Sequence, residues 1–302
     1  MLTRPGLNTP TMRNLLRQSA AAVAALVGPA AAFVGGVVLV ILLTPQAHAP
    51  RPLTVSLDPT SLTAKAAILY DPTLHLVLYQ KNADQSLPLA SITKLMTAEV
   101  VLASKSPATP VTITAEDIKP SGDWGFKPGE TVALGDLLSF GLIVSSNDAM
   151  AAVASSLGSD AITKMNETAA AMGLTKTYFL NPTGLDVSQS VSGAYSSAYD
   201  VARLAATFYQ DHPDYFVQTT ESGATIAVQG QDLAAAATAL PLSNLPGFIA
   251  GKTGYTDLAG GNLVVVFDVE PGHPLVAAVL GSTADGRFSD IRTLVNAAYQ
   301  AL

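Results

Sequence analysis

The segment from Ala90 to Ala103 constrains the fold most, because its apolar residues leave little of its surface free for water. Apolar residues recur along it at helical steps of three and four, and others fill the opposite side: Ile92, Leu95, Met96, Val100 and Ala103, then Ala98, Val101 and Leu102. This pattern predicts a helix that is buried on nearly all sides, inside a domain. Ser91 would lie in the first turn of that helix, and Lys94 would lie one turn further along the same face.

A hydroxyl and an amine at this spacing suit nucleophilic catalysis. Free N–H groups at a helix start stabilise negative charge, and an apolar setting favours the neutral amine, which could then act as a base for Ser91. The alternative is that Ser91 is an ordinary helix-start residue and Lys94 a solvated side chain. Because a Ser-x-x-Lys match arises by chance roughly once in a chain this long, the pair needs support from elsewhere in the sequence.

Composition excludes several classes of function. The net charge of −7 and the lack of a long basic run argue against a surface that binds nucleic acid. The absence of cysteine excludes disulfides, thiol nucleophiles and cysteine-ligated zinc. The four histidines lack the spacing of a zinc hydrolase. The sequence also lacks the Gly-x-Ser-x-Gly motif that is typical of many Ser-His-Asp hydrolases. We therefore expect no metal and no cofactor. The histidines are His48, His75, His212 and His273.

The N-terminal region has the features of a membrane segment. Arg4, Arg13 and Arg17 precede residues 19–43, which carry no charge and are long enough to cross a membrane. The positive flank predicts a cytoplasmic N-terminus, residues 1–18, and an extracytoplasmic remainder.

A cleaved signal sequence is the alternative for residues 19–43. Ala47-His48-Ala49 offers a cleavage site, but Pro50 would follow the cut and disfavours it. If cleavage occurs, the protein is secreted. In either case the proline-rich residues 44–60 read as an extended linker, and residues 61–302 as the folded domain.

The domain pattern predicts an α+β fold. Two short strands form a hairpin near its start, helical segments fill its middle, and three strands and a helix close it. We expect strands at 66–70, 74–79, 248–255, 262–268 and 274–280, and helices at 134–144, 147–157, 160–172, about 197–210 and 287–301. This order implies a mainly antiparallel sheet with helices packed on it. Residues 220–245 are rich in alanine and receive no assignment.

Two further motifs accompany the Ser-x-x-Lys pair. Ser145-Ser146-Asn147 lies between two predicted helices, where a loop can present a hydroxyl and a carboxamide to a cleft. Lys252-Thr253-Gly254 lies on the first closing strand, where the glycine allows close approach of another backbone. A specified tripeptide is expected by chance in only about one chain in twenty of this length, so the three motifs together are informative.

These motifs resemble those of the D-alanyl-D-alanine carboxypeptidase family of low-molecular-mass penicillin-binding proteins. The resemblance covers about residues 64–302 and implies a fold like that of serine β-lactamases and penicillin-binding-protein transpeptidases, with the nucleophile where sheet and helices join. Ser146 stands where the family most often has glycine. The segments that carry the resemblance are Ala90 to Thr97, Ser145 to Ala149, Asn181-Pro182-Thr183-Gly184-Leu185 and Gly251 to Asp257.

The resemblance also implies roles for individual residues. Ser91 would be the nucleophile and Lys94 its base, while Ser145 would relay a proton and Asn147 would hold the substrate backbone. Lys252 and Thr253 would supply positive charge and a hydrogen-bond donor to the substrate's terminal carboxylate, and Arg287 would be a further contact. The backbone N–H groups of Ser91 and Tyr255 would form the oxyanion hole. The catalytic residues implied are Ser91, Lys94, Ser145, Asn147 and Lys252, and those implied for substrate binding are Thr253, Gly254, Tyr255 and Arg287.

The implied activity is removal of the terminal D-Ala from a peptidoglycan stem peptide, with β-lactams as covalent inhibitors and the membrane as a further partner. Alternatives are a peptidoglycan endopeptidase, a serine β-lactamase, and an inactive cell-wall-binding domain. A class A β-lactamase uses a glutamate to activate water, usually in a Glu-x-x-x-Asn stretch, and this sequence has none.

Overall fold

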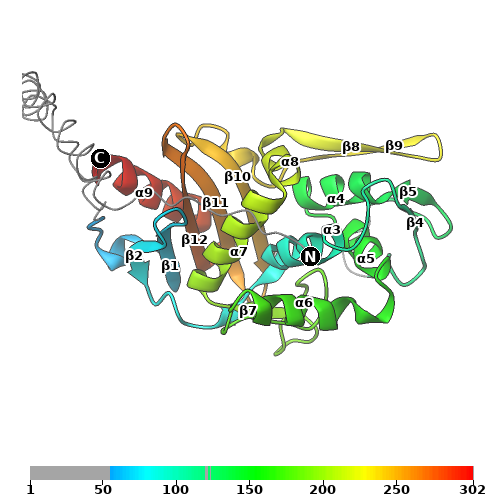
Figure 1. Cartoon of the computed structure of the whole chain (residues 1–302), viewed down its shortest axis with the longest axis horizontal. Coiled ribbons are helices and arrows are strands. Elements are labelled where there is room, and N and C mark those ends of the chain that lie inside the picture. Colours follow the sequence, from blue (N-terminus) through cyan, green and yellow to red (C-terminus); the bar gives the residue numbers. More distant parts are fainter. Residues whose placement is uncertain (1–54, 120–121, 123, 302) are drawn as a thin grey trace, which may run out of the picture. The chain divides into compact units, whose positions relative to one another are not determined.

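A five-stranded antiparallel sheet, with strand order β10-β11-β12-β1-β2, forms the centre of the domain (Figure 1). The computed structural model describes residues 55–119, 122 and 124–301. The first strand pairs with the last, Ala66 opposite Leu280, so segments from both ends of the domain build one sheet. The predicted hairpin and three closing strands are confirmed. The strands are β1 (Ala66–Asp71), β2 (Leu76–Lys81), β10 (Phe248–Thr256), β11 (Gly260–Glu270) and β12 (His273–Ser282).

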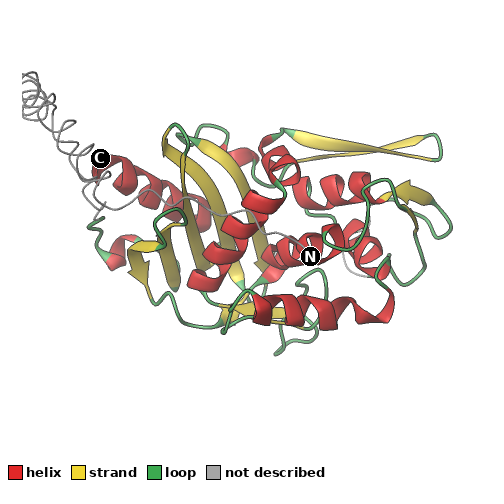
Figure 2. Ribbon diagram, in the orientation of Figure 1, coloured by secondary structure: helices red, strands yellow, loops and turns green. Residues whose placement is uncertain are grey.

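The sheet is covered by helices on both faces (Figure 2). Successive residues of a strand point to opposite faces, and on β11 Val264 belongs to the core beneath α7 (Ala198–Asp211), whereas Val265 belongs to the core beneath α9 (Gly286–Ala301). Burial on both sides explains why β11 and β12 read as nearly continuous apolar runs rather than as alternating patterns.

The middle of the chain is helical, as the sequence predicts. The helix that carries Lys94, α3, begins after a 3-10 turn at Ala90–Ile92, and every residue from Thr93 to Val101 is buried. It packs against α4, α5, α6 and α7, which explains why it is apolar all round. The helices of this region are α3 (Thr93–Leu102), α4 (Leu134–Ile143), α5 (Asn147–Ser155), α6 (Ala161–Ala171), α7 and the short α8 (Pro213–Phe216).

The alanine-rich stretch without an assignment contains a two-stranded ribbon, β8 (Gly223–Val228) and β9 (Gln231–Ala236). Gln229 and Gly230 both have positive φ, as a tight hairpin turn with matching twist requires. The remaining strands form a three-stranded sheet and a two-stranded sheet: β3 (Leu87–Pro88), β6 (Tyr178–Phe179) and β7 (Ala194–Ser196), then β4 (Pro110–Thr112) and β5 (Thr131–Ala133).

The predicted membrane segment at residues 19–43 lies outside the described residues. None of the helices within the described part combines the length and apolar character needed to span a membrane. Val55 and Leu57 pack against the core beneath α9.

Asp290 on α9 fastens the start of the domain to its end. Its buried carboxylate accepts hydrogen bonds from the backbone N–H groups of Thr63 and Ala64, each at 2.9 Å, and from the Ser282 hydroxyl at 2.7 Å. We expect Asp290→Ala to lower the free energy of unfolding by about 3 kcal/mol, because three donors lose their acceptor. Urea unfolding measures this. Asp232→Ala, which removes an exposed aspartate from β9, should change stability by less than about 0.5 kcal/mol; equal effects would contradict this role.

Candidate active site

Ser91 and Lys94 meet where the sheet joins the helical region. Ser91 lies in the 3-10 turn before α3 and is partly exposed, whereas the Lys94 side chain is fully buried. Lys94 Nζ lies 2.7 Å from Ser91 Oγ. The reactive hydroxyl is therefore accessible from outside while its partner amine is shielded from water.

The Lys94 amine has three oxygen partners from three parts of the chain. Besides Ser91 Oγ, it donates to Asn147 Oδ1 at 2.7 Å and to the Thr183 carbonyl at 3.1 Å. A neutral amine has two N–H bonds and one lone pair. If both N–H bonds are used by Asn147 and Thr183, the lone pair faces Ser91 Oγ, as a general base requires.

Electrostatics favour that neutral form. Burial lowers the pKa of Lys94 well below its usual 10.5, and the positive charge of Lys252 lowers it further. Ser91 therefore faces an amine that can accept its proton.

The second lysine organises the opposite side of the site. Lys252 on β10 is fully buried, and its Nζ donates to Ser145 Oγ at 2.8 Å and to the Thr253 carbonyl at 3.1 Å. Burial, assisted by Arg287, lowers the pKa of Lys252 to about 7. Ser145 has a φ of 65°, a left-handed conformation unusual for a non-glycine residue and frequent at functional sites.

Two glycines pack against the backbone of the nucleophile turn, which is the 3-10 turn at Ala90–Ile92 that contains Ser91. A Cβ on Gly184 would lie 1.9 Å from the Ala90 carbonyl oxygen, and one on Gly254 would lie 3.1 Å from the Ser91 amide nitrogen. Ala90 itself has a φ of 50°. Two other segments pack closely against this turn, because Gly184 and Gly254 have no side chain at the points of contact. This packing keeps the turn in its strained conformation.

Gly254 also links the nucleophile to the remaining predicted binding residues. Arg287, at the start of α9, donates from Nη1 to the Gly254 carbonyl at 2.7 Å. Thr253 is buried next to Lys252, and the Tyr255 side chain is 52% exposed. The structure thus places all nine predicted site residues around one region, with Arg287 bound to backbone rather than free toward the cleft.

Sequence reasoning missed two residues that position the site. The Thr183 carbonyl holds Lys94, whereas residues 181–185 were named above only as one of the segments that carry the family resemblance, with no role for Thr183. Asn262 on β11 is fully buried; its amide donates to the Pro88 and Leu89 carbonyls at 2.9 and 3.0 Å and accepts from Gly281 N at 2.8 Å. A single asparagine in an apolar strand gave no signal of this tie to the nucleophile turn.

In the described part of the chain, no three histidine, aspartate or glutamate side chains are grouped closely enough to hold a metal ion.

The close contact between Gly184 and the Ala90 carbonyl predicts that a side chain at position 184 lowers the stability of the protein. Gly184→Ala should lower the free energy of unfolding by about 3 kcal/mol or more, because the added methyl group collides with a backbone carbonyl that cannot move freely. Gly158→Ala is the matched control: Gly158 also has positive φ, but its Cβ would meet open space, so a cost of about 1 kcal/mol is expected. Denaturant unfolding of both variants compares them, and similar losses would mean that the contact with Ala90 does not matter.

The buried charge on Lys252 predicts a pH-dependent stability. Below about pH 7 the amine is charged in both folded and unfolded states, so the folded state bears the full cost of burying it. Above that pH the folded state releases the proton while the unfolded state keeps it, and stability rises. Lys252→Met should therefore be more stable than the parent by roughly 1–2 kcal/mol at pH 6, with a smaller difference at pH 9.

Urea unfolding at the two pH values measures this difference. The exposed Lys105→Met serves as control and should show no such trend. A parent protein more stable than Lys252→Met at pH 6 would contradict the assignment.

Comparison with known proteins identifies relatives of the whole domain. The family model described as D-alanyl-D-alanine carboxypeptidase matches residues 53–284. D-alanyl-D-alanine carboxypeptidase DacC of Escherichia coli is 31% identical over 276 residues, which are 86% of this chain and 66% of DacC. The D-alanyl-D-alanine endopeptidase of Pseudomonas aeruginosa is 36% identical over 149 residues, 47% of this chain and 46% of that protein.

A third relative, D-alanyl-D-alanine carboxypeptidase DacF of Bacillus subtilis, is 36% identical over 151 residues, 47% of this chain and 38% of DacF. The chain thus spans between 38% and 66% of the length of these three relatives.

Solved structures have the same fold. The crystal structure of the D-alanyl-D-alanine carboxypeptidase from Mycobacterium tuberculosis superposes with a TM-score of 0.74 at 27% identity, covering 82% of this chain and 94% of that one. Penicillin-binding protein D2 from Listeria monocytogenes, in its ampicillin-bound form, gives 0.67 at 29% identity, covering 79% and 98%. The chain therefore belongs to the D-alanyl-D-alanine carboxypeptidase family and has the α+β fold of penicillin-binding proteins.

Proposed function

We propose that the protein is a serine-type D-alanyl-D-alanine carboxypeptidase, which removes the terminal D-Ala from peptidoglycan stem peptides through an acyl-enzyme on Ser91. The observation that carries this proposal is the position of Lys94 Nζ, 2.7 Å from both Ser91 Oγ and Asn147 Oδ1. A desolvated amine beside a partly exposed hydroxyl and a carboxamide is suited to acyl transfer.

In the acylation step, Ser91 Oγ attacks the carbonyl carbon of the penultimate D-Ala while its proton passes to Lys94 Nζ. The C–N bond to the terminal D-Ala then breaks, and the leaving nitrogen takes up that proton from Lys94, relayed through the Ser145 hydroxyl, which Lys252 holds at 2.8 Å. Water later attacks the ester and gives one proton to Lys94, which passes it to Ser91 Oγ as the bond between the acyl carbon and that oxygen breaks, and the shortened stem is released.

The oxyanion formed in each step needs donors. The backbone N–H groups of Ser91 and Tyr255 are suited to this role, because Gly254 lies against the Ser91 amide and Tyr255 follows it in the chain. Each such donor contributes roughly 3 kcal/mol to stabilising the transition state.

The substrate's terminal carboxylate calls for positive charge and a hydroxyl. Lys252 and Thr253 supply both on β10, and Arg287 at the start of α9, whose Nη1 is held by the Gly254 carbonyl, adds positive charge nearby. β10 is an edge strand of the sheet, and beyond Gly251, whose N–H donates to the Thr219 hydroxyl at 3.0 Å, its outer side is available to the main chain of a bound peptide.

An endopeptidase that cuts cross-links is the second candidate, since the Pseudomonas aeruginosa relative carries that name. A β-lactamase is disfavoured by the lack of a Glu-x-x-x-Asn stretch to activate water. An inactive wall-binding domain would not need the paired lysine contacts that surround Ser91 and Ser145.

The N-terminal segment supports a location at the cell membrane. Three arginines precede 25 uncharged residues at 19–43, which fit an anchor that leaves the catalytic domain on the extracytoplasmic side. Cleavage after Ala49 would instead release the domain.

The proposed nucleophile is tested by mass and by product. Penicillin should add its own mass to the parent protein once, and the adduct should persist for minutes or longer; Ser91→Ala should show no adduct. Release of D-Ala from a muropeptide ending in D-Ala-D-Ala should fall by about a thousandfold or more in Ser91→Ala.

Equal release by the parent and by Ser91→Ala would remove Ser91 from the mechanism. Rapid loss of penicillin absorbance would identify a β-lactamase instead, and cleavage of cross-linked muropeptide dimers in preference to pentapeptide stems would identify an endopeptidase.

A further inference from the structure

Asn262 on β11 binds the backbone just ahead of Ser91. Its amide nitrogen donates to the carbonyls of Pro88 and Leu89 at 2.9 and 3.0 Å, and its amide oxygen accepts from Gly281 N at 2.8 Å. The side chain is fully buried. A flipped amide would set its oxygen against two carbonyls and its nitrogen against an N–H group, so the hydrogen bonds fix the orientation of this side chain.

The sheet is irregular at this position. The pairing of β11 with β12 shifts between Gly261 and Leu263, and Gly281 has a φ of 67°. Bulges of this kind re-aim a side chain and are frequent beside active sites. Here Gly281 N donates to the Asn262 side chain, so one amide joins β12, β11 and the segment that leads into α3.

Holding the Leu89 carbonyl restrains the N–H group of Ser91, because only Ala90 separates the two. Ala90 has a φ of 50°, a conformation that needs support from its surroundings. Gly254 leaves room for this segment, since a Cβ there would lie 3.0 Å from the Leu89 carbonyl oxygen and 3.1 Å from Ser91 N. Gly254 and Asn262 are opposite each other in the pairing of β10 with β11, so the same segment lies against both.

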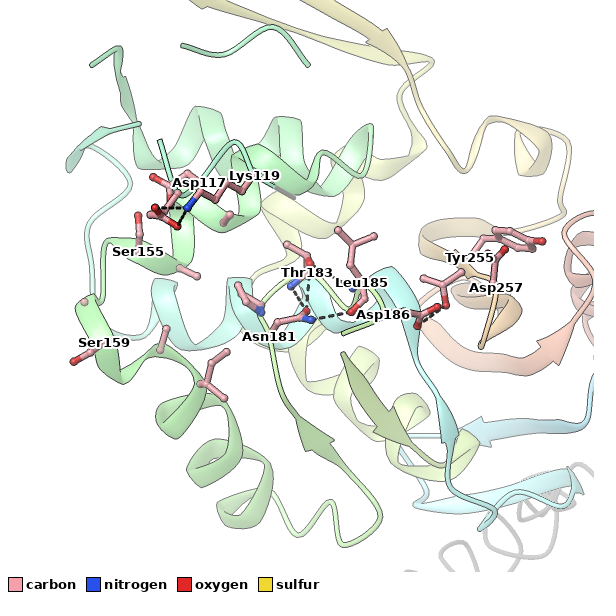
Figure 3. Close-up of a pocket in the computed structure, with 18 residues that line it drawn as sticks. Asp117, Lys119, Ser155, Ser159, Asn181, Thr183, Leu185, Asp186, Tyr255 and Asp257 are labelled. Carbon is pink, nitrogen blue, oxygen red and sulfur yellow. Dashed lines mark hydrogen bonds and ion pairs between the residues drawn. The ribbon is translucent and has the colours of Figure 1, made fainter. Parts of the chain in front are cut away.

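The N–H group of Tyr255 is held by the same pair of strands. Tyr255 follows Gly254, which lies opposite Asn262. Along a strand, successive N–H groups alternate between its two sides. Gly251 N points away from β11, to the Thr219 hydroxyl at 3.0 Å, and the N–H group of Tyr255, four residues on, therefore points the same way. Tyr255 also lines a surface groove, so this end of β10 is open to a substrate (Figure 3).

We propose that Asn262 is a positioning residue of the oxyanion hole, whose amide sets the separation of the N–H groups of Ser91 and Tyr255. One of these donors belongs to the turn that the amide binds, and the other belongs to the strand that pairs with β11. The inference rests on the proposed function, in which both N–H groups bind the charged oxygen of the intermediate. Asn262 acts through the backbone and is not itself a ligand of that oxygen.

Loss of the amide should slow the chemistry more than it weakens binding. An oxyanion hole stabilises charge that develops only as the reaction proceeds, so a misplaced donor lowers the rate and leaves ground-state binding nearly unchanged. The reaction of the full-length protein with rising concentrations of penicillin separates these two quantities. In Asn262→Ala the limiting acylation rate should fall by about tenfold or more, while the dissociation constant of the non-covalent complex stays within about twofold.

Asn166 on α6 offers a matched control, because it makes the same three kinds of hydrogen bond elsewhere in the molecule. Its amide nitrogen donates to the Ile162 and Phe179 carbonyls at 3.0 and 2.9 Å, and its oxygen accepts from Phe179 N at 2.9 Å. Asn166→Ala therefore loses as many hydrogen bonds as Asn262→Ala, but should keep the limiting acylation rate of the parent. Rates are expressed per site that finally reacts with penicillin, so unfolded protein does not count.

The carbonyl stretch of the penicilloyl ester reports the oxyanion hole directly. Hydrogen bonds to the ester oxygen polarise the C=O bond and lower its frequency in infrared difference spectra. In Asn262→Ala the band should move to higher frequency, toward that of the denatured acyl-enzyme, whereas in Asn166→Ala it should stay at the parent frequency. A side chain that only stabilised the fold would not shift this band, because the folded acyl-enzyme would keep its oxyanion hole.

The outcomes separate this inference from the proposed function. A parent-like acylation rate or an unshifted ester band in Asn262→Ala overturns the inference and leaves the carboxypeptidase intact, as does equal slowing in Asn166→Ala. If Asn262→Ala does not fold, Asn262→Ser, which keeps one donor, is measured in the same way. If neither folds while Asn166→Ala does, Asn262 is needed for the fold as a whole, and the inference is again overturned. A parent that forms no penicillin adduct and releases no D-Ala fails the proposed function itself, and the inference with it.

Discussion

Burial of the Lys94 amine is the interaction on which the rest of the site depends. An amine in water is protonated at neutral pH and cannot act as a base. Here the apolar surroundings of α3 and the nearby charge of Lys252 favour the neutral form. Two acceptors, Asn147 Oδ1 and the Thr183 carbonyl, use its N–H bonds and leave its lone pair for Ser91.

This arrangement costs stability, and the surrounding fold must offset that cost. Two lysines are fully buried, and Ala90 and Ser145 both adopt left-handed backbone conformations. Such features persist only where neighbouring packing determines them. Gly184 supplies that packing from the helical region, and Asn262 supplies it from the sheet by tying β11 to the residues before Ser91. The site therefore lies where the helical region and the sheet meet, and contacts from both hold its backbone.

Much of this could be predicted from the sequence, for physical reasons that differ between elements. The burial of α3 followed from apolar residues on all its faces, and the strands of the sheet followed from long apolar runs between turns. The β8 and β9 ribbon could not be predicted in the same way, because alanine has little preference for strands and its turn has Gln229 where asparagine, aspartate or glycine is usual before Gly230.

The candidate site shows the same division. The three motifs indicated which side chains converge, since each combines a reactive group with a local backbone feature. The Thr183 carbonyl could not be identified, because backbone atoms leave no mark in a residue pattern. Asn262 was hidden within an apolar strand, and the two carbonyls to which it donates, those of Pro88 and Leu89, lie more than 170 residues away in the chain.

The pKa of Lys94 is the measurement that tests this account most directly. Lysine labelled with ¹³C at Cε reports the charge of each amine by NMR, and Lys94→Arg identifies the Lys94 signal. The account predicts a titration well below the usual value of 10.5 in the parent protein. A Lys94 signal that titrates near 10.5 would mean that the amine is charged at neutral pH, and the base assigned to Ser91 would have to be sought elsewhere.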